Sequence, residues 1–226
     1  IPLPLFTLRE SVLRLGAPLL IVEDGFGIAR ALAAKLIARG IDAEVGTVQS
    51  TGAYAGVVSF AAGFDVPLHS LLGLARRLGA SARCFITVTA LGGSFGFDGV
   101  ARGALGQVGA LGFTKALARE WPDCIVKAVD VDAGLGAGII AQQIADELFS
   151  GDRRVEVGFT KAGRVGVALV PAEQAEAFAL TAASVVLVTG GARGLGFSFA
   201  QALARKYGCT VSLASRTPSA EAAAAV

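Results

Sequence analysis

The sequence has 226 residues, of which 54% are hydrophobic and 17% are charged, and its 20 basic and 18 acidic residues leave a net charge of +2. This balance provides no basic stripe of the kind that binds nucleic acid, so we expect no nucleic-acid partner. A single histidine and three separated cysteines offer too few ligands for a metal site and too few groups for a Ser-His-Asp triad, and they favour free thiols in a reducing cytosol.

The longest stretch without a charged residue, Val45–Phe64, has the length of a membrane helix. Its glycines and its polar residues, among them Gln49 and Ser50, argue against insertion in lipid. The opening segment Ile1–Phe6 carries two prolines and no basic residue, unlike a signal peptide. We therefore expect a cytoplasmic protein without membrane contact.

Strands and helices alternate through the first three quarters of the chain. The apolar runs predict strands at Leu19–Val22, Ile41–Val48, Val57–Phe60, Cys84–Val88 and Ile125–Val131. The helical periodicity predicts helices at Ile28–Arg39, Leu68–Leu78, Gly106–Glu120 and Ile139–Phe149. Repeated strand–helix–strand units predict the α/β class, with a parallel sheet and a Rossmann-like arrangement. Val155–Ala168 has an extended but less regular pattern.

After Pro171 the pattern starts again. It predicts a short helix at Glu173–Thr181, a strand at Val185–Val188, a helix at Phe197–Lys206 and a strand at Val211–Ala214. We therefore expect a first lobe over residues 1–170, a connector over residues 171–183, and the first β-α-β unit of a second, incomplete Rossmann-like lobe over residues 184–226.

A glycine-rich loop lies between the strand and the helix of the second lobe. It reads Thr189-Gly190-Gly191-Ala192-Arg193-Gly194-Leu195-Gly196. In that setting glycines permit a tight turn and a close approach to a pyrophosphate, which the helix N-terminus attracts. The next strand ends at Ser215-Arg216-Thr217, where an arginine suits the 2′-phosphate of NADPH, and Arg193 adds a second positive charge. The alternative is a structural turn that binds nothing.

This loop and the Ser215-Arg216 ending resemble the short-chain dehydrogenase/reductase superfamily. The phrases Gly109–Pro122, ending in Glu-Trp-Pro, and Val155–Phe159 are similar to those of ketoreductase domains in polyketide and polyunsaturated-fatty-acid synthases. The resemblance implies two lobes, namely a truncated structural lobe that binds no cofactor and a catalytic lobe that binds NADPH. It also implies reduction of a β-keto thioester held on an acyl carrier protein, among neighbouring synthase domains.

Within the first lobe, the residues that match the family's catalytic positions differ from it. The resemblance places the tyrosine position on Gly103, the lysine position on Gln107 and the serine position near Thr89 or Ala90. A glycine cannot donate the proton that reduction needs. The shortened loop Glu23–Gly27 also carries two carboxylates, which we expect to repel a pyrophosphate.

The sequence contains no Tyr-x-x-x-Lys, because Val58 and Val211 follow its two tyrosines, Tyr54 and Tyr207, at that spacing. We therefore assign no catalytic residue, expect this segment alone to be inactive, and expect the catalytic groups of a β-ketoacyl reductase beyond Val226. One alternative is a non-catalytic structural module of a multidomain synthase. Another is a free-standing short-chain dehydrogenase with an unrelated N-terminal domain.

Overall fold

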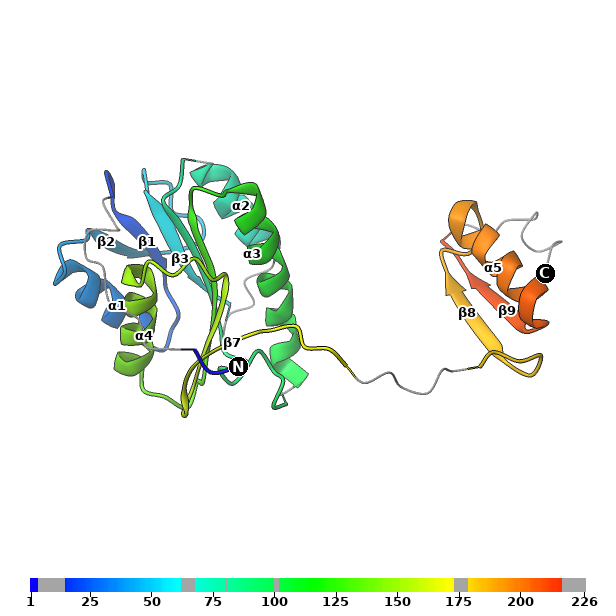
Figure 1. Cartoon of the computed structure of the whole chain (residues 1–226). Coiled ribbons are helices and arrows are strands. Elements are labelled where there is room, and N and C mark those ends of the chain that lie inside the picture. The colour runs from blue at the N-terminus through cyan, green and yellow to red at the C-terminus, as the bar shows by residue number, and fades with distance from the viewer. Residues whose placement is uncertain (4–14, 62–67, 80, 100–101, 173–178, 217–226) are drawn as a thin grey trace. The chain divides into compact units, whose positions relative to one another are not determined.

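The computed structural model describes residues 1–3, 15–61, 68–79, 81–99, 102–172 and 179–216 (Figure 1). The chain divides into two compact units, Ile1–Leu169 (unit 1) and Val170–Val226 (unit 2), and each has its own hydrophobic core. None of the helices within the described ranges combines the length and the apolar character that crossing a membrane requires.

Unit 1 is built on a seven-stranded sheet. The strands lie in the order β2-β1-β3-β4-β5-β6-β7, and all neighbours are parallel except β6 and β7. Their bounds are β1 Leu19–Val22, β2 Ala43–Gly46, β3 Gly56–Phe60, β4 Cys84–Thr89, β5 Ile125–Val131, β6 Glu156–Thr160 and β7 Gly163–Gly166. The predicted α/β class is confirmed.

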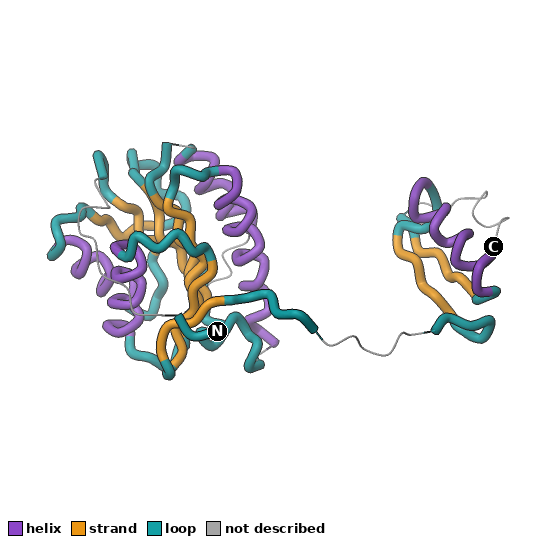
Figure 2. The backbone as a smooth tube through the Cα atoms, viewed as in Figure 1, coloured by secondary structure: helices purple, strands orange, loops and turns teal. Residues whose placement is uncertain are grey.

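Helices cover both faces of this sheet (Figures 1 and 2). Helix α1 packs against α4 on one face, and α2 packs against α3 on the other. Their bounds are α1 Ile28–Ile37, α2 Leu68–Leu78, α3 Val108–Glu120 and α4 Ala137–Phe149. A 3-10 helix, η2 (Arg102–Gln107), leads into α3, so the helix predicted from Gly106 begins as an α-helix two residues later. Such tighter turns are common at helix N-termini.

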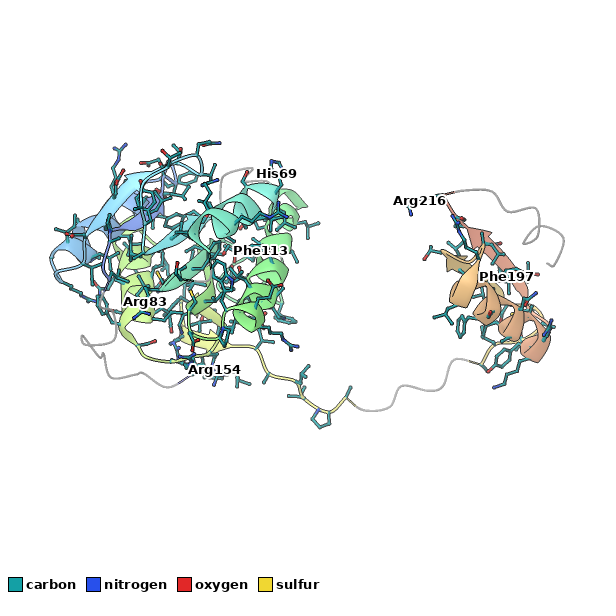
Figure 3. The ribbon with its side chains drawn as sticks, turned by 90° about the horizontal axis from the view of Figure 1, so that it is seen from above. His69, Arg83, Phe113, Arg154, Phe197 and Arg216 are labelled. Atoms are coloured by element: carbon teal, nitrogen blue, oxygen red, sulfur yellow. The ribbon has the colours of Figure 1, made fainter. Side chains whose placement is uncertain are left out.

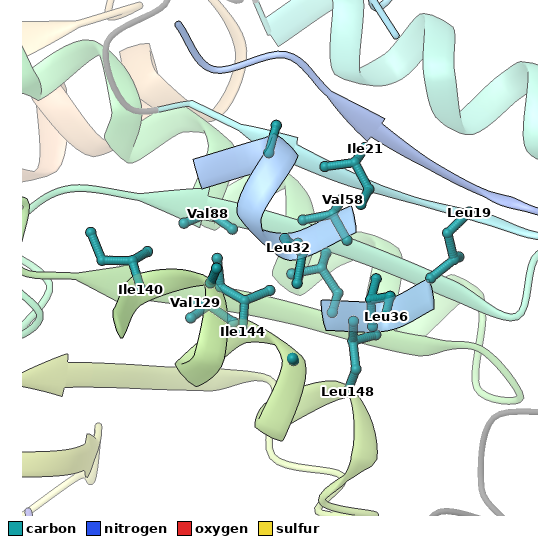
Figure 4. Close-up of a cluster of buried hydrophobic side chains, with 14 of the residues drawn as sticks. Leu19, Ile21, Leu32, Leu36, Val58, Val88, Val129, Ile140, Ile144 and Leu148 are labelled. Atoms are coloured by element: carbon teal, nitrogen blue, oxygen red, sulfur yellow. The ribbon is translucent and has the colours of Figure 1, made fainter. Parts of the chain in front are cut away.

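The central strands are buried on both faces because each face carries a helix layer. Every residue of β3 and β4 is buried, and side chains from β1, β3 and β4 pack against Leu32 and Leu36 of α1 (Figure 4). Such strands read as continuous apolar runs, which is why their predicted bounds agree with the structure within one residue. The edge strand β2 is shorter than the predicted Ile41–Val48.

Four charged side chains form an ion cluster beside the end of α4, in which Lys127, Glu147 and Arg164 are buried and Asp152 is partly exposed. Arg164 donates from Nη2 to both oxygens of Glu147, at 2.5 and 3.1 Å, and to Asp152 at 2.5 Å. The Nζ atom of Lys127 lies 3.5 Å from Glu147 Oε1. Glu147 and Lys127 are 0% and 1% exposed, and the two cations balance the two anions. The cluster therefore links α4 and β7 through charge-assisted hydrogen bonds, and α4 and β5 through an ion pair.

The surroundings of this ion cluster shift the pKa of two of its members. Burial lowers the pKa of Lys127, and the Glu147 carboxylate opposes that shift. Partial burial alone would raise the pKa of Asp152, but hydrogen bonds from the Arg164 side chain and the Arg154 backbone outweigh it. They hold the pKa of Asp152 below its ordinary value of 3.8.

We expect Asp152→Asn to destabilise unit 1 at neutral pH and to lose this effect in acid. A carboxyl group whose pKa is lower in the folded than in the unfolded chain stabilises the fold above its ordinary pKa, and the contribution disappears as the pH falls through the depressed value. Urea unfolding at several pH values, followed by fluorescence of the single tryptophan, Trp121, measures this. The exposed Asp123→Asn should have little effect throughout. A deficit of Asp152→Asn that persists below the folded-state pKa would contradict the assignment.

The segment predicted as irregular, Val155–Ala168, forms the β6–β7 hairpin. Its short turn reverses the chain, so β7 pairs antiparallel and departs from the expected all-parallel sheet. Gly158 and Gly93 permit a close backbone approach between β6 and the loop after β4. A Cβ atom on Gly158 would lie 2.0 Å from the Gly93 carbonyl oxygen.

Unit 2 contains the parallel strands β8 (Val185–Thr189) and β9 (Thr210–Ala214), joined by helix α5 (Gly194–Tyr207). The helix covers one face of the pair, where Ala200, Cys209 and Val211 form a buried cluster. On β8, Val185 and Leu187 remain 72% and 65% exposed. Most of the helix predicted at Glu173–Thr181 lies outside the described residues, and residues 179–181 are not helical.

Candidate functional site

The glycine-rich loop of unit 2 lies at the carboxyl ends of both of its strands. Thr189, the last residue of β8, pairs with Ala214, the last residue of β9. The Gly190 N–H group then donates to the Ala214 carbonyl oxygen at 2.7 Å. This bond places the loop beside Ser215 and Arg216, and Figure 3 shows Arg216 just beyond β9. The structure thus brings together the two sequence features predicted to bind a dinucleotide.

The four glycines of the loop have two different structural roles. Gly190 and Gly194 have positive φ angles of 71° and 58°, and open space surrounds the position of a Cβ atom on each. A Cβ on Gly196 would lie 2.6 Å from the Gly190 carbonyl oxygen, and one on Gly191 would lie 2.8 Å from Leu213 Cδ2. The first pair permits the turn and leaves room above it, whereas the second pair permits close packing.

Helix α5 begins directly behind this loop. Its N-cap residue Arg193 has extended backbone angles and, within the described residues, makes no side-chain hydrogen bond to the helix. Arginine carries no acceptor atom, so Arg193 cannot satisfy the N–H groups of the first turn. The positive end of the helix dipole and these donors face the open side of the loop, beside the exposed Leu195. The arrangement is suited to an anion.

The corresponding loop of unit 1 is filled by its own carboxylate. Asp24 is fully buried, and its Oδ2 and Oδ1 atoms accept hydrogen bonds from the N–H groups of Ile28 and Ala29, each at 3.0 Å. The other carboxylate, Glu23, lies 3.6 Å from Arg30. The expectation of simple repulsion by two carboxylates is therefore refined, because Asp24 occupies the helix N-terminus where a phosphate would bind.

We expect Asp24→Ala to lower the free energy of unfolding of unit 1 by about 1–2 kcal/mol, the range for loss of a helix cap. The change leaves the two N–H groups at the start of α1 without their acceptor. Urea unfolding followed by Trp121 fluorescence measures it, and Glu23→Ala provides the neighbouring control with an expected change within about 1 kcal/mol. Equal effects of the two variants would contradict the capping role.

The residues near the catalytic positions of unit 1 serve structure. Thr89 Oγ1 donates to Asp130 Oδ1 at 2.6 Å, and Asp130 also accepts from the N–H groups of Leu91 at 2.7 Å and Phe95 at 2.8 Å. Phe95 has a positive φ of 59°, which these bonds help to hold. Burial raises the pKa of Asp130, while the hydrogen bonds from Thr89 and the backbone oppose the shift.

Gln107, which occupies the position that the resemblance assigns to the lysine, also takes part in the internal hydrogen bonds of unit 1. Gln107 Oε1 accepts a hydrogen bond from the Ala90 N–H group at 2.8 Å, and both Gly103 and Gln107 lie in η2. The sequence interpretation missed Asp130. The available signal was a carboxylate within the otherwise apolar end of β5, where burial requires hydrogen-bond partners.

The described residues contain no group of three or more His, Cys, Asp or Glu side chains that would hold a metal ion. Cys84, Cys124 and Cys209 are free and buried, as predicted, and burial raises the pKa of Cys124 to about 12. Thr217, predicted as part of the cofactor site, lies outside the described residues.

No protein-family model matches the chain, and no curated protein matches it. Solved structures do. An A-type ketoreductase from a modular polyketide synthase matches 97% of the chain, with 23% identity and a TM-score of 0.56. The chain shares the fold of polyketide synthase ketoreductase domains. The first ketoreductase of the tylosin polyketide synthase matches 89% of the chain, with 21% identity and a TM-score of 0.58.

The chain spans about half the length of these ketoreductase structures, 54% and 55% respectively. A multidomain structure of a keto acid-selecting nonribosomal peptide synthetase module, with adenylation, ketoreductase and pseudo Asub domains, matches the whole chain at 13% identity, with a TM-score of 0.62. That match covers 23% of the larger protein. The predicted resemblance to synthase ketoreductases is thereby confirmed at the level of the fold.

Proposed function

We propose that this chain is the front portion of an NADPH-dependent β-ketoacyl reductase in a carrier-protein-based synthase. Residues 1–170 serve as the structural lobe, and residues 184–226 open the catalytic lobe. The observation that carries the proposal is the start of α5, where Arg193 cannot cap the helix, beside the glycine loop and Arg216. Ketoreductase structures of the same fold support it.

The residues present fit a dinucleotide. The N–H groups at the start of α5 bind the pyrophosphate, and the open space at Gly190 and Gly194 leaves room for it. The Arg216 guanidinium binds the 2′-phosphate, with Arg193 as a second positive charge. When bound, NADPH supplies the hydride that converts a β-keto thioester into a β-hydroxy thioester. Unit 1 takes no dinucleotide because Asp24 already fills the start of α1.

The proton donor for this reduction belongs, in the proposal, to residues that follow Val226 in the longer protein. Neither Tyr54 nor Tyr207 has a lysine at the required spacing. The substrate is an acyl chain on an acyl carrier protein, and neighbouring synthase domains are the other partners.

A non-catalytic structural module is the second candidate. It is favoured by the use of Thr89 and Gln107 in the internal hydrogen bonds of unit 1 and by the absence of Tyr-x-x-x-Lys from the sequence. The two candidates differ in whether a catalytic set follows Val226 in the intact polypeptide.

The test compares the 226-residue chain with the protein extended to the length of the matched ketoreductases. The extended protein should bind NADPH and oxidise it when a β-ketoacyl thioester is added, while the shorter chain should show no reduction. Gly196→Val in the extended protein should abolish binding, because the added side chain collides with the Gly190 carbonyl. A folded extended protein that binds no NADPH would contradict the ketoreductase proposal and favour the structural module.

A further inference from the structure

Unit 1 contains an apolar pocket of about 460 Å³ at the carboxyl ends of its central strands. Phe60 at the end of β3, Val88 near the end of β4 and Val131 at the end of β5 contribute to its lining, together with Phe26 before α1 and Ile140 of α4. Figure 4 shows the side chains of two of the lining residues, Val88 and Ile140. In open α/β sheets this edge is where ligands bind.

The lining consists entirely of hydrophobic residues. A large apolar side chain of the lining also reaches the solvent, because Phe26 is 68% exposed. A volume of this size is within the usual range of small-ligand pockets, roughly 300–1,000 Å³. Exposed apolar side chains around such a pocket favour an apolar ligand.

The charged groups around the pocket disfavour an anion. Asp132 lies between two lining residues, Val131 and Ala133, and is partly exposed. The Asp24 carboxylate accepts hydrogen bonds from the N–H groups at the start of α1. Glu23, the preceding residue in the chain, adds a second carboxylate and forms an ion pair with Arg30. At the rim of the pocket, the start of α4 attracts negative charge, and Asp132 precedes it in the chain.

We propose that this pocket binds an uncharged, largely aliphatic small molecule. The lining residues all belong to unit 1 and the glycine loop belongs to unit 2, so the proposal does not depend on cofactor binding in unit 2. The Asp24 carboxylate excludes phosphate-bearing ligands from α1, and the apolar walls accommodate a hydrocarbon chain in place of a nicotinamide nucleotide.

The test is a titration of the full chain with 1-octanol, followed by NMR of Val, Leu and Ile methyl groups. We expect saturable shifts at Val88, Val131 and Ile140, and about ten-fold weaker binding of octanoate because its charge lies near Asp132. The octanoate titration also tests whether the start of α4 draws a carboxylate into the pocket. Tighter binding of octanoate than of octanol would overturn the assignment of an uncharged ligand.

Two variants locate the binding. Ala133→Trp places a large side chain at the exposed rim and should weaken octanol binding about ten-fold or more, whereas Ala34→Trp on the exposed face of α1 should leave it unchanged. Ala137→Leu in the first turn of α4 is a second variant that reduces the pocket, in case Ala133→Trp disturbs the fold. Absence of saturable shifts at the lining methyl groups, or equal affinities of the Ala133 and Ala34 variants, would overturn the proposal.

Discussion

Glu147→Ala is expected to lower the free energy of unfolding of unit 1 by about 3–5 kcal/mol, the range for removing one partner of a buried ion pair. The variant leaves the buried Arg164 and Lys127 cations with Asp152 as their remaining carboxylate in the ion cluster. Their desolvation is then no longer compensated. Urea unfolding followed by Trp121 fluorescence measures the loss.

The matched control is a surface ion pair of the same unit. Lys115 Nζ lies 3.2 Å from Glu156 Oε2, and its side chain is 53% exposed. Lys115→Ala should change the free energy of unfolding by less than about 1 kcal/mol, as exposed pairs generally do. A comparable loss in both variants would show that the buried ion cluster contributes no more to the free energy of unfolding than an exposed ion pair does.

Arg216→Ser, made in the extended protein, is expected to weaken NADPH binding by about 10–100-fold and to leave NADH binding nearly unchanged. The range corresponds to the loss of charge-assisted hydrogen bonds to one phosphate group. Arg216 lies two residues after the end of β9, beside the glycine loop, whose Gly190 N–H group donates a hydrogen bond to Ala214. NADH lacks the 2′-phosphate, so its binding should not depend on the Arg216 side chain. Fluorescence titration with both cofactors measures the two affinities.

Arg205→Ser provides the control for Arg216→Ser. Arg205 is also exposed, but it lies in the last turn of α5, at the opposite end of the helix from the loop. Its replacement should affect both cofactors little. Equal weakening of NADPH and NADH by Arg216→Ser would show that this side chain does not contact the 2′-phosphate.

The predictable parts of the structure are those with local causes. Because both faces are covered, β3, β4 and most of β5 are runs of hydrophobic residues with few polar ones, so a short stretch of sequence is enough to place them. The glycine loop of unit 2 is similar, because its strand, turn and helix follow one another within a few residues. Its role as a cofactor site remains a prediction.

The rest depends on contacts between distant segments. Lys127, Glu147 and Arg164 belong to three separate elements, and no local pattern indicates that they meet in one buried ion cluster. The apolar pocket is likewise assembled from the ends of several strands and the start of α4. Asp24 has a local signal, since it lies just before a helix, but the expectation of repulsion did not include its hydrogen bonds to the N–H groups at the start of α1.

Because the Asp24 carboxylate lies at the start of α1, the stability of unit 1 and the stability of unit 2 should depend differently on solute concentration. A tethered anion is held at an effective concentration that dissolved phosphate does not approach, so α1 is capped whether or not nucleotide is present. Under the proposed function, the start of α5 takes its anion from solution, and a bound cofactor stabilises the folded form of unit 2 in proportion to the logarithm of the cofactor concentration. Changes in cofactor supply would therefore alter the stability of unit 2 while leaving that of unit 1 constant.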